Sequence, residues 1–428
     1  MARFVITGGK ALHGTVQPIG NKNAVVKMIP ATLLTTEPVT LTHVPDIRDV
    51  DTMLSIMKTL GTDITYDKTK GVLTLQTKTI MKTIVDPDLA KKLRASNMFL
   101  GPLLARKGMV TGIMPGGDKI GPREMNAHFD GLRQLGARYK KNADDSFTLK
   151  GKVVGADVFL YEPSVTATEN VILAAVLASG ETTITNAASE PHVQELCRML
   201  NGMGATIDGI GTNRLHIVGV DRLHGTTHQV PVDYIYVGTM VVLAAITGGE
   251  LTIQNVVHDD LKTIVYFFEK LGVRTVMKGN DLVVPGKQRL VIRDHEWARI
   301  KGVYSQPWPC FPSDMMSLMI VLATQVKGST LFFEKMYSGR MFFADYLNGL
   351  GANIIIADPY RVVVNGKSKL RGGTLYATDI RAGMAYVAAG LCAEGKTVVE
   401  HVDHIDRGYP HIEKVLQALG ARIERVES

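Results

Sequence analysis

The segment VQELCRMLNGMGATI, residues 193–207, contains the pattern from which the fold can be predicted. Val193, Leu196 and Leu200 recur at helical spacing, so they predict one buried face of a helix. Gly204 follows where a helix commonly ends in a left-handed residue, a conformation that glycine adopts without a Cβ clash. Alternating apolar and polar residues around a turn come next, in ATIDGIGTNRLHIVG, as in a half-buried hairpin. The segment therefore predicts a helix, a glycine turn and a β-hairpin.

The same pattern occurs six times along the chain, roughly every 70 residues. The turns read LGTDI, LGARY, MGATI, LGVRT, LGANI and LGARI, and they begin at Leu60, Leu135, Met203, Leu271, Leu350 and Leu419. Most of these helices follow a further strand pattern, such as GETTITNAASE, and an Ala- and Met-rich helix, such as AGMAYVAAGLCAEG, precedes that strand. Each repeat is therefore predicted as strand, helix, strand and strand, with a further helix before it.

Six repeats can stack as an open solenoid or close into compact domains. The chain has 428 residues, and at about 150 residues per domain it is expected to form two or three domains. Three repeats per domain would give two similar lobes, each large enough for one hydrophobic core. We place the division near residue 230. Periodicity does not assign the N-terminal strand-rich segment to either lobe.

The composition is typical of a water-soluble protein, with 45% hydrophobic and 21% charged residues. The opening residues, MARFVITGGKALHGTV, lack the continuous apolar run of a signal peptide. The segment YVGTMVVLAAITGG is shorter than the ~20 apolar residues that a membrane-spanning helix needs. We therefore expect a cytoplasmic protein without a membrane partner.

The net charge of +7 favours anionic ligands, although a basic solvated surface is the simpler alternative. Basic residues are spread along the chain and aromatic residues make up only 6%, so nucleic acid is not an expected partner. Cys197, Cys310 and Cys392 are isolated and odd in number, so they predict neither a disulfide framework nor a zinc site. We expect small phosphates or carboxylates as ligands, with no metal and no cofactor. The sequence gives no indication of protein partners.

Four polar segments interrupt the repeats, and irregular loops in regular scaffolds commonly carry function. They are IGNKNA at 19–24, PGGDKIGPR at 115–123, PWPCFPSD at 307–314, and ATDIR at 377–381 together with HIDRGY at 404–409. Each brings charged side chains to the start of an apolar helix or into a glycine- or proline-rich turn. These segments are our candidates for the functional site.

These segments, with RASNMFLGPLLAR and PSVTATEN, resemble in order and spacing the UDP-N-acetylglucosamine 1-carboxyvinyltransferases of the enolpyruvyl transferase family. The resemblance covers essentially the whole chain. It implies an α/β fold, α+β in some schemes, with two inside-out α/β barrel lobes built from six βαβαββ repeats. Lobe I would span 22–229 and include the PGGD loop, and lobe II would combine 1–21 with 230–428. The active site would lie in the cleft between them.

The resemblance implies transfer of the enolpyruvyl group of phosphoenolpyruvate to the 3-hydroxyl of UDP-N-acetylglucosamine, with release of phosphate. This is the first committed step of peptidoglycan precursor synthesis, on which cell wall biogenesis, cell shape and cell division depend. Lys22, Arg123 and Arg407 match the positions that hold the phosphate and carboxylate of phosphoenolpyruvate, which need cationic partners. Asp314 matches the residue that takes the proton of the acceptor hydroxyl. Its simpler alternative is a helix N-cap that stabilises the helix by ~1 kcal/mol.

The remaining matched positions are expected to bind or orient substrate. They are Asn23, Arg94, Glu162, Pro163, Ser164, Val165, Thr166, Met336, Arg340, Asp379 and Arg381.

Asp118 departs from the family, most members of which have a cysteine there as proton donor. A carboxyl group donates a proton near neutral pH only if desolvation or anionic neighbours raise its pKa. Lys119 and Arg123 oppose such a rise, and a bound phosphate favours it. We hypothesise that Asp118 is protonated mainly in the substrate complex, so activity should favour lower pH. Fosfomycin alkylates the family cysteine, and a carboxylate is a weaker nucleophile than a thiolate, so we predict insensitivity to fosfomycin.

Three further departures leave the acceptor open. The family pattern SVGAT is SVTAT at 164–168, RPVDxH is REMNAH at 123–128, and PDRIExGT is PVDYIYVGT at 231–239. The added Thr166 side chain could crowd a backbone amide near the diphosphate. The alternatives are therefore an enolpyruvyl transferase with another nucleotide or sugar acceptor, and a non-catalytic protein that binds a UDP-sugar.

Overall fold

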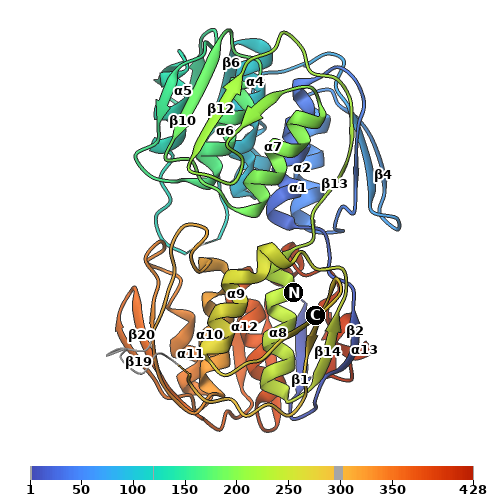
Figure 1. Cartoon of the computed structure of the whole chain (residues 1–428), viewed down its shortest axis with the longest axis vertical. Coiled ribbons are helices and arrows are strands. Elements are labelled where there is room, and N and C mark those ends of the chain that lie inside the picture. The colour runs from blue at the N-terminus through green and yellow to red at the C-terminus, as the bar shows by residue number, and fades with distance from the viewer. Residues whose placement is uncertain (1, 119, 294–301, 428) are drawn as a thin grey trace. The chain divides into compact units, whose positions relative to one another are not determined.

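The computed structural model describes residues 2–118, 120–293 and 302–427, and its chain divides into two compact units (Figure 1). Unit 1 comprises residues 1–19, 118–122 and 232–428, and unit 2 comprises residues 20–117 and 123–231. The expected lobes gave the whole PGGD loop to the first lobe, whereas Asp118 and residues 120–122 belong to unit 1. There the Gly339 amide donates to the Ile120 carbonyl at 2.9 Å.

Unit 2 contains three repeats. The first consists of α1 (Lys22–Ala31), η1 (Thr32–Leu34), β3 (Val39–Thr42), α2 (Arg48–Thr59), β4 (Asp63–Asp67) and β5 (Val72–Gln76). The second consists of α3 (Pro87–Ala90), η2 (Arg94–Phe99), α4 (Leu100–Lys107), β6 (Met109–Ile113), α5 (Asn126–Gln134), β7 (Arg138–Lys141) and β8 (Ser146–Lys150). The third consists of β9 (Asp157–Phe159), α6 (Val165–Ala175), β10 (Glu181–Thr185), α7 (Pro191–Gly202), β11 (Thr206–Asp208) and β12 (Arg214–Val218), and β13 (Thr227–Gln229) follows it.

Unit 1 begins with β1 (Arg3–Thr7) and β2 (His13–Val16). The fourth repeat consists of α8 (Tyr234–Thr247), β14 (Glu250–Ile253), α9 (His258–Lys270), β15 (Val276–Lys278) and β16 (Asp281–Val284). The fifth consists of β17 (Gly302–Tyr304), η3 (Ser313–Met315), α10 (Met316–Thr324), β18 (Gly328–Phe333), α11 (Phe343–Gly349), β19 (Ile354–Asp358) and β20 (Arg361–Gly366). The sixth consists of β21 (Thr374–Tyr376), α12 (Ile380–Cys392), β22 (Lys396–Glu400), η4 (Val402–Arg407), α13 (Ile412–Ala418) and β23 (Arg422–Val426).

Each repeat forms one small sheet in which the third, fourth, second and first strands lie in that order, as in β11-β12-β10-β9. The second repeat has a three-stranded sheet, and an isolated parallel bridge between Ile84 and Thr111 stands in place of its first strand. The N-terminal segment completes two different repeats, because β2 pairs with β14 and β1 lies between β22 and β23. Likewise β13, which follows the third repeat, pairs with β3 of the first. The predicted βαβαββ repeats are confirmed.

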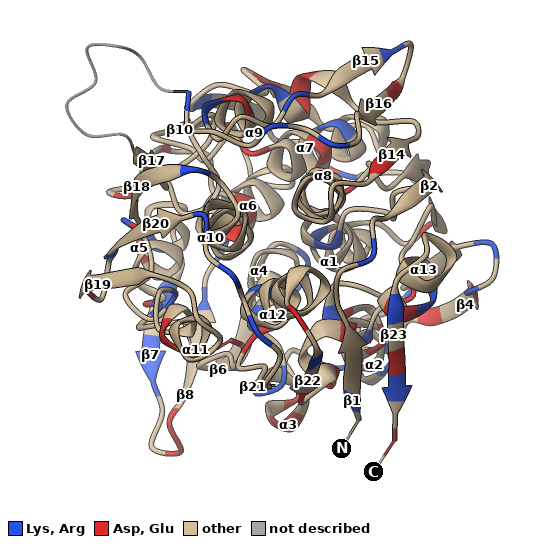
Figure 2. Ribbon diagram, turned by 90° about the horizontal axis from the view of Figure 1, so that it is seen from below, with Lys and Arg blue, Asp and Glu red and all other residues tan. Residues whose placement is uncertain are grey.

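Each unit has inner helices that are buried on almost every side, whereas the helices that precede the glycine turns bury only one face. In unit 1, α8, α10 and α12 pack against one another, and three sheets lie around them (Figure 2). These inner helices are apolar on every side and almost entirely buried, as expected for helices in a protein core. The segment YVGTMVVLAAITGG forms most of α8, and no helix in the described ranges is long and apolar enough to cross a membrane. The inside-out α/β fold is therefore confirmed.

The six turn glycines at 61, 136, 204, 272, 351 and 420 all have positive φ, between 78° and 100°. The prediction that a left-handed glycine follows the helix before each of these turns is confirmed.

A buried ion pair joins two inner helices of unit 2. The Lys27 ammonium of α1 lies 3.4 Å from Glu169 Oε1 of α6, and both side chains are at least nine-tenths buried. Burial raises the pKa of Glu169 to about 7, although the Lys27 charge opposes this rise. Burial also lowers the pKa of Lys27, against the attraction of Glu169. Because Lys22 opens α1 and Thr166 lies at the start of α6, this pair fixes two helices that carry candidate site residues.

We expect Lys27→Met to lower the free energy of unfolding by about 3 kcal/mol, because it leaves the Glu169 carboxyl buried without its partner. Adding Glu169→Leu should restore most of the loss. Chemical denaturation of the single and double variants measures both effects.

Lys68 offers a matched control in the same unit. It contacts Asp46 and Asp51 at 2.8 and 2.9 Å, but its side chain is 44% exposed. Lys68→Met should therefore cost less than about 1 kcal/mol. Equal losses for the Lys27 and Lys68 variants would contradict the role assigned to the buried pair.

Candidate functional site

The predicted site residues fall in both units, which are described in turn. Unit 1 holds Asp118, Asp314, Met336, Arg340, Asp379, Arg381 and Arg407, and unit 2 holds Lys22, Asn23, Arg94, Arg123 and residues 162–166.

In unit 1, two of the three inner helices begin at an aspartate that caps them. The Asp233 carboxylate accepts from the amides of the first turn of α8 at 2.9 and 3.1 Å. The Asp379 carboxylate does the same for α12 at 2.8 and 3.0 Å. Such caps satisfy backbone donors that have no partner within the helix. Asp379 therefore has a structural role besides the predicted one.

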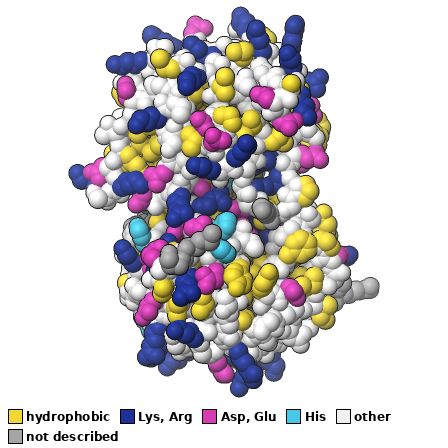
Figure 3. Space-filling view, turned by 180° about the vertical axis from the view of Figure 1, so that it is seen from behind, with side chains coloured by type: hydrophobic (Ala, Val, Ile, Leu, Met, Phe, Trp, Pro, Cys, Tyr) yellow, Lys and Arg dark blue, Asp and Glu magenta, His cyan; other side chains and the backbone are white. Residues whose placement is uncertain are grey.

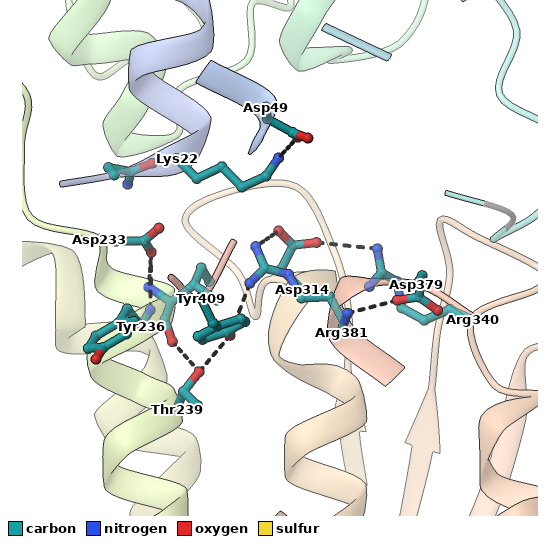
Figure 4. Close-up of polar contacts among 12 residues, drawn as sticks. Lys22, Asp49, Asp233, Tyr236, Thr239, Asp314, Arg340, Asp379, Arg381 and Tyr409 are labelled. Carbon is teal, nitrogen blue, oxygen red and sulfur yellow. Dashed lines mark hydrogen bonds and ion pairs between the residues drawn. The ribbon is translucent and has the colours of Figure 1, made fainter. Parts of the chain in front are cut away.

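The third aspartate, Asp314, is arranged differently (Figure 4). Arg381 Nη2 donates to its Oδ2 at 2.7 Å, and Arg340 Nη2 donates to its Oδ1 at 3.2 Å. The cap residues of η3 and α10 are Pro312 and Met315, and neither makes a side-chain cap bond. Asp314 is thus the second residue of η3 and not its cap residue, and its carboxylate accepts from two guanidinium groups.

The two arginines are buried while the carboxylate is partly accessible. Their side chains are 5% and 8% exposed, against 28% for Asp314. Burial opposes the charge on Arg381, but the carboxylate of Asp314 outweighs it and holds the pKa of Arg381 above its usual value. Within the described part of the chain, Nε and Nη1 of Arg340 have no hydrogen-bond partner. Buried donors without a partner are uncommon in proteins, and here they lie beside the Asp314 carboxylate.

Glu334, which the sequence analysis missed, connects two candidate segments. Its buried carboxylate accepts from the Ser305 and Ser313 hydroxyls at 2.8 and 2.7 Å, and from the amides of Met336 and Tyr337. It thus ties the proline-rich turn to the segment that carries Met336. No local pattern marks this glutamate, since the two serines that it joins to this segment are 29 and 21 residues away.

Asp118 and Arg407 are neighbours in unit 1. Arg407 Nη1 donates to Asp118 Oδ1, and both side chains are largely buried. Arg407 is the last residue of η4. The residue before it, Asp406, accepts hydrogen bonds from both terminal nitrogens of Arg425 at 2.9 and 2.6 Å. The structure therefore brings together two residues that were predicted separately. Lys119 lies outside the described residues.

In unit 2, Lys22 opens α1. The Asn21 side chain caps this helix by accepting from the Ala24 amide at 3.1 Å, and Asn23 follows Lys22 in the first turn. The Lys22 ammonium lies 2.7 Å from Asp49 Oδ2 of α2. Asp49 was not predicted, because nothing local distinguishes it from an acidic residue that favours the start of a helix.

The glycine-rich loop lies against two predicted arginines of unit 2. A Cβ on Gly117 would come within 2.9 Å of Arg123 Nη2 and 3.0 Å of Arg94 Cβ, and its φ is +120°. Arg94 Nη2 also donates to the Glu124 carbonyl at 2.9 Å. A side chain at this position would therefore contact both arginines, and the positive φ also favours glycine.

Thr166, a departure from the family pattern, contacts a histidine that the pattern keeps. Thr166 Oγ1 lies 2.8 Å from His128 Nε2, which is also 3.0 Å from Asn97 Nδ2. Burial, and next the Arg94 charge, lower the pKa of His128 to about 3, so the ring is neutral. The Thr166 hydroxyl thus has a partner in the same unit. Residues 162–164 precede α6, where the Ser164 amide donates to the Glu162 carbonyl at 2.7 Å.

Neither the surface charge nor the acidic side chains indicate a further ligand site. In the view of Figure 3, basic side chains are spread over both units with acidic ones among them. The described residues contain no group of three or more His, Cys, Asp or Glu side chains that could hold a metal ion.

Comparison with known proteins agrees with these motifs. The EPSP synthase (3-phosphoshikimate 1-carboxyvinyltransferase) family matches residues 6–416. A protein of Treponema denticola named UDP-N-acetylglucosamine 1-carboxyvinyltransferase is 46% identical over 428 residues, which cover 100% of both chains. A protein of Bradyrhizobium diazoefficiens with the same name is 45% identical and covers 99% of this chain and 98% of its own.

Solved structures show the same fold. The enolpyruvyl transferase NikO from Streptomyces tendae has a TM-score of 0.88 and 22% identity, and the match covers 100% of this chain and 99% of NikO. EPSP synthase from Acinetobacter baumannii has a TM-score of 0.76 and 20% identity, with both chains fully covered. Since identity to the named relatives extends over the full length, this chain belongs to the UDP-N-acetylglucosamine 1-carboxyvinyltransferase family of enzymes, within the EPSP synthase-type enolpyruvyl transferases.

Proposed function

We propose that this protein transfers the enolpyruvyl group of phosphoenolpyruvate to the 3-hydroxyl of UDP-N-acetylglucosamine and releases phosphate, as the first committed step of peptidoglycan precursor synthesis in the cytoplasm. The observation that carries this proposal is the full-length identity of 43–46% to relatives named for that activity. The ion-paired carboxylates and the arginines of the site supply the groups that the reaction needs.

In the first step, the acceptor oxygen forms a bond to C2 of phosphoenolpyruvate while C3 takes up a proton. Asp314 accepts the hydroxyl proton, since its carboxylate is partly exposed and Arg340 and Arg381 fix its orientation. Lys22, Arg123 and Arg407 bind the phosphate and carboxylate of phosphoenolpyruvate. The product of this step is a tetrahedral intermediate that still carries the phosphate on C2.

In the second step, C3 loses a proton, the carbon–carbon double bond forms again, and the bond from C2 to the phosphate oxygen breaks. Phosphate leaves with the bonding electrons. Asp118 donates the proton to C3 in the first step, in place of the cysteine that most family members use. Its ion pair with Arg407 supports a coupling to substrate, because an anion that binds Arg407 competes with the Asp118 carboxylate for this guanidinium.

The remaining matched residues orient the acceptor and balance charge. Arg340 offers its buried Nε and Nη1 donors, and residues 162–166 present the start of α6 to the diphosphate. The contact between Thr166 and His128 supports UDP-N-acetylglucosamine as the acceptor, because it gives the added side chain a place within the unit. Another nucleotide or sugar acceptor is the alternative that the acceptor comparison below tests.

Phosphate release from phosphoenolpyruvate tests the proposal directly. Purified protein should release phosphate with UDP-N-acetylglucosamine and not with UMP, UDP-glucose or no acceptor. Asp118→Asn should lower the rate by about 10²- to 10⁴-fold, as expected for loss of a general acid. Asp145→Asn, which changes a carboxylate 93% exposed in a hairpin turn, is the control and should leave the rate unchanged.

The other outcomes are equally informative. Phosphate release only with a different acceptor would contradict the acceptor assignment. No phosphate release with any acceptor, despite binding of a UDP-sugar, would indicate a non-catalytic protein.

The wild-type rate should fall as pH rises from about 5 to 9, because the proton donor must be protonated. A rate independent of pH over this range would contradict the role of Asp118.

Fosfomycin gives a second test of position 118. The wild-type protein should keep its activity after incubation with fosfomycin, and Asp118→Cys should be inactivated because a thiolate opens the epoxide. Peptide mapping by mass spectrometry should locate the adduct at position 118 of the variant. The exposed Cys310 serves as an internal control for non-specific alkylation. An adduct on Asp118 of the wild-type protein would overturn this prediction.

Gly117→Ala should raise the KM for phosphoenolpyruvate about tenfold, a change equivalent to ~1.4 kcal/mol, because the new Cβ displaces Arg94 and Arg123. Steady-state kinetics measures this change. Gly180→Ala is the matched control, since Gly180 has φ +95° but nothing within 4 Å of the added Cβ. Both variants have backbone strain of ~1–2 kcal/mol. An equal rise in KM for both would show that strain alone is responsible.

A further inference from the structure

Tyr409 is a fully buried residue beside the Asp314 network, and no role follows for it from the motif comparison. We propose that Tyr409 is a positioning residue for the reaction: its hydroxyl fixes Arg381 Nη1, so that Arg381 Nη2 holds Asp314 in the orientation that accepts the proton of the acceptor. This inference rests on the proposed function, in which Asp314 is the base. Figure 4 shows the residues that carry it.

The hydrogen bonds around Tyr409 have only one possible direction. Thr239 Oγ1 lies 2.8 Å from the Ile235 carbonyl and 2.8 Å from the Tyr409 hydroxyl. The carbonyl can only accept, so the single hydrogen of Thr239 goes to it, and Tyr409 must donate to Thr239. Arginine can only donate, so Arg381 Nη1 donates to the Tyr409 oxygen at 3.1 Å. The four groups form one directed chain from Arg381 to the backbone of α8.

This chain connects the starts of all three inner helices of unit 1. Thr239 belongs to α8, Arg381 to the first turn of α12, and Asp314 to η3, which leads into α10. The two terminal nitrogens of Arg381 are divided between Tyr409 and Asp314. Without the Tyr409 hydroxyl, Nη1 would lose its acceptor, and the guanidinium could rotate away from the geometry that serves Asp314.

Aromatic packing holds the Tyr409 ring in place. The Tyr236 ring stacks on it with centroids 5.8 Å apart and an interplanar angle of 28°. Tyr236 occupies the position of the glutamate in the family pattern PDRIExGT, and Tyr234 occupies that of the arginine. The Tyr234 ring packs edge-on against Trp308 of the proline-rich turn. Burial raises the pKa of both Tyr236 and Tyr409, although Arg381 opposes the rise for Tyr409, so both hydroxyls stay neutral.

The first experiment compares Tyr409→Phe with the wild-type protein in steady-state kinetics. The substitution keeps the stacked ring and removes only the hydroxyl. We expect kcat to fall about tenfold with the KM for phosphoenolpyruvate unchanged, because binding groups stay in place while the base loses its orientation. Tyr386→Phe is the control: Tyr386 is a buried tyrosine of α12 whose hydroxyl donates to the Phe343 carbonyl at 3.3 Å. It should leave kcat unchanged.

The second experiment is a double-mutant cycle with Arg381→Lys. If Tyr409 acts through Arg381, Tyr409→Phe should have no further effect on kcat in the Arg381→Lys background. An additional tenfold loss in that background would overturn the proposal, as would wild-type kcat for Tyr409→Phe alone. Thermal unfolding of both tyrosine variants separates a loss of fold from a loss of orientation.

The wild-type assay separates failure of this inference from failure of the proposed function. If wild-type protein turns over UDP-N-acetylglucosamine and Tyr409→Phe is equally fast, only the positioning role is wrong. If the wild-type protein releases no phosphate, the proposed function fails, and the positioning role falls with it.

Discussion

The burial of the inner helices on every side is the constraint on which the rest of the structure depends. A helix leaves its first backbone amides without partners, and these groups need acceptors when solvent is excluded. Asp233 and Asp379 meet this need for α8 and α12 in unit 1, and Asn21 meets it for α1 in unit 2. Polar side chains therefore gather at the starts of the inner helices, and the candidate site residues occur at these same positions.

Asp314 differs from the other two aspartates because its acceptor capacity is used by side chains rather than by backbone amides. Two buried arginines would be costly without a carboxylate between them, and removing one partner of such an arrangement leaves an uncompensated charge. The same arrangement keeps a carboxylate at the protein surface in a fixed orientation, with spare arginine donors beside it. The stabilising ion pairs and the proposed base are thus one set of residues.

The sequence alone predicts the parts of this structure that depend on local pattern. The six glycine turns and the repeat follow from spacing, and the motifs identify most candidate residues. Glu334 and Asp49 were missed because their roles come from partners far along the chain, which periodicity does not encode. Periodicity could not assign the N-terminal segment for a related reason, since β1 and β2 complete repeats whose other strands lie at least 230 residues away.

The departures from the family pattern contact neighbouring residues of the same unit that the pattern keeps. Thr166 has a partner in His128, and Tyr236, at the position of a glutamate in the family pattern, stacks on Tyr409. A charged pair at the start of α8 would need its own counter-charges in a buried setting, whereas two tyrosines need only aromatic partners and a few hydrogen bonds. With tyrosines at these positions, the shortest ion pair of Arg381 is the one with Asp314. Tyr236 thus packs on the ring whose hydroxyl accepts from Arg381, and Arg381 in turn donates to Asp314.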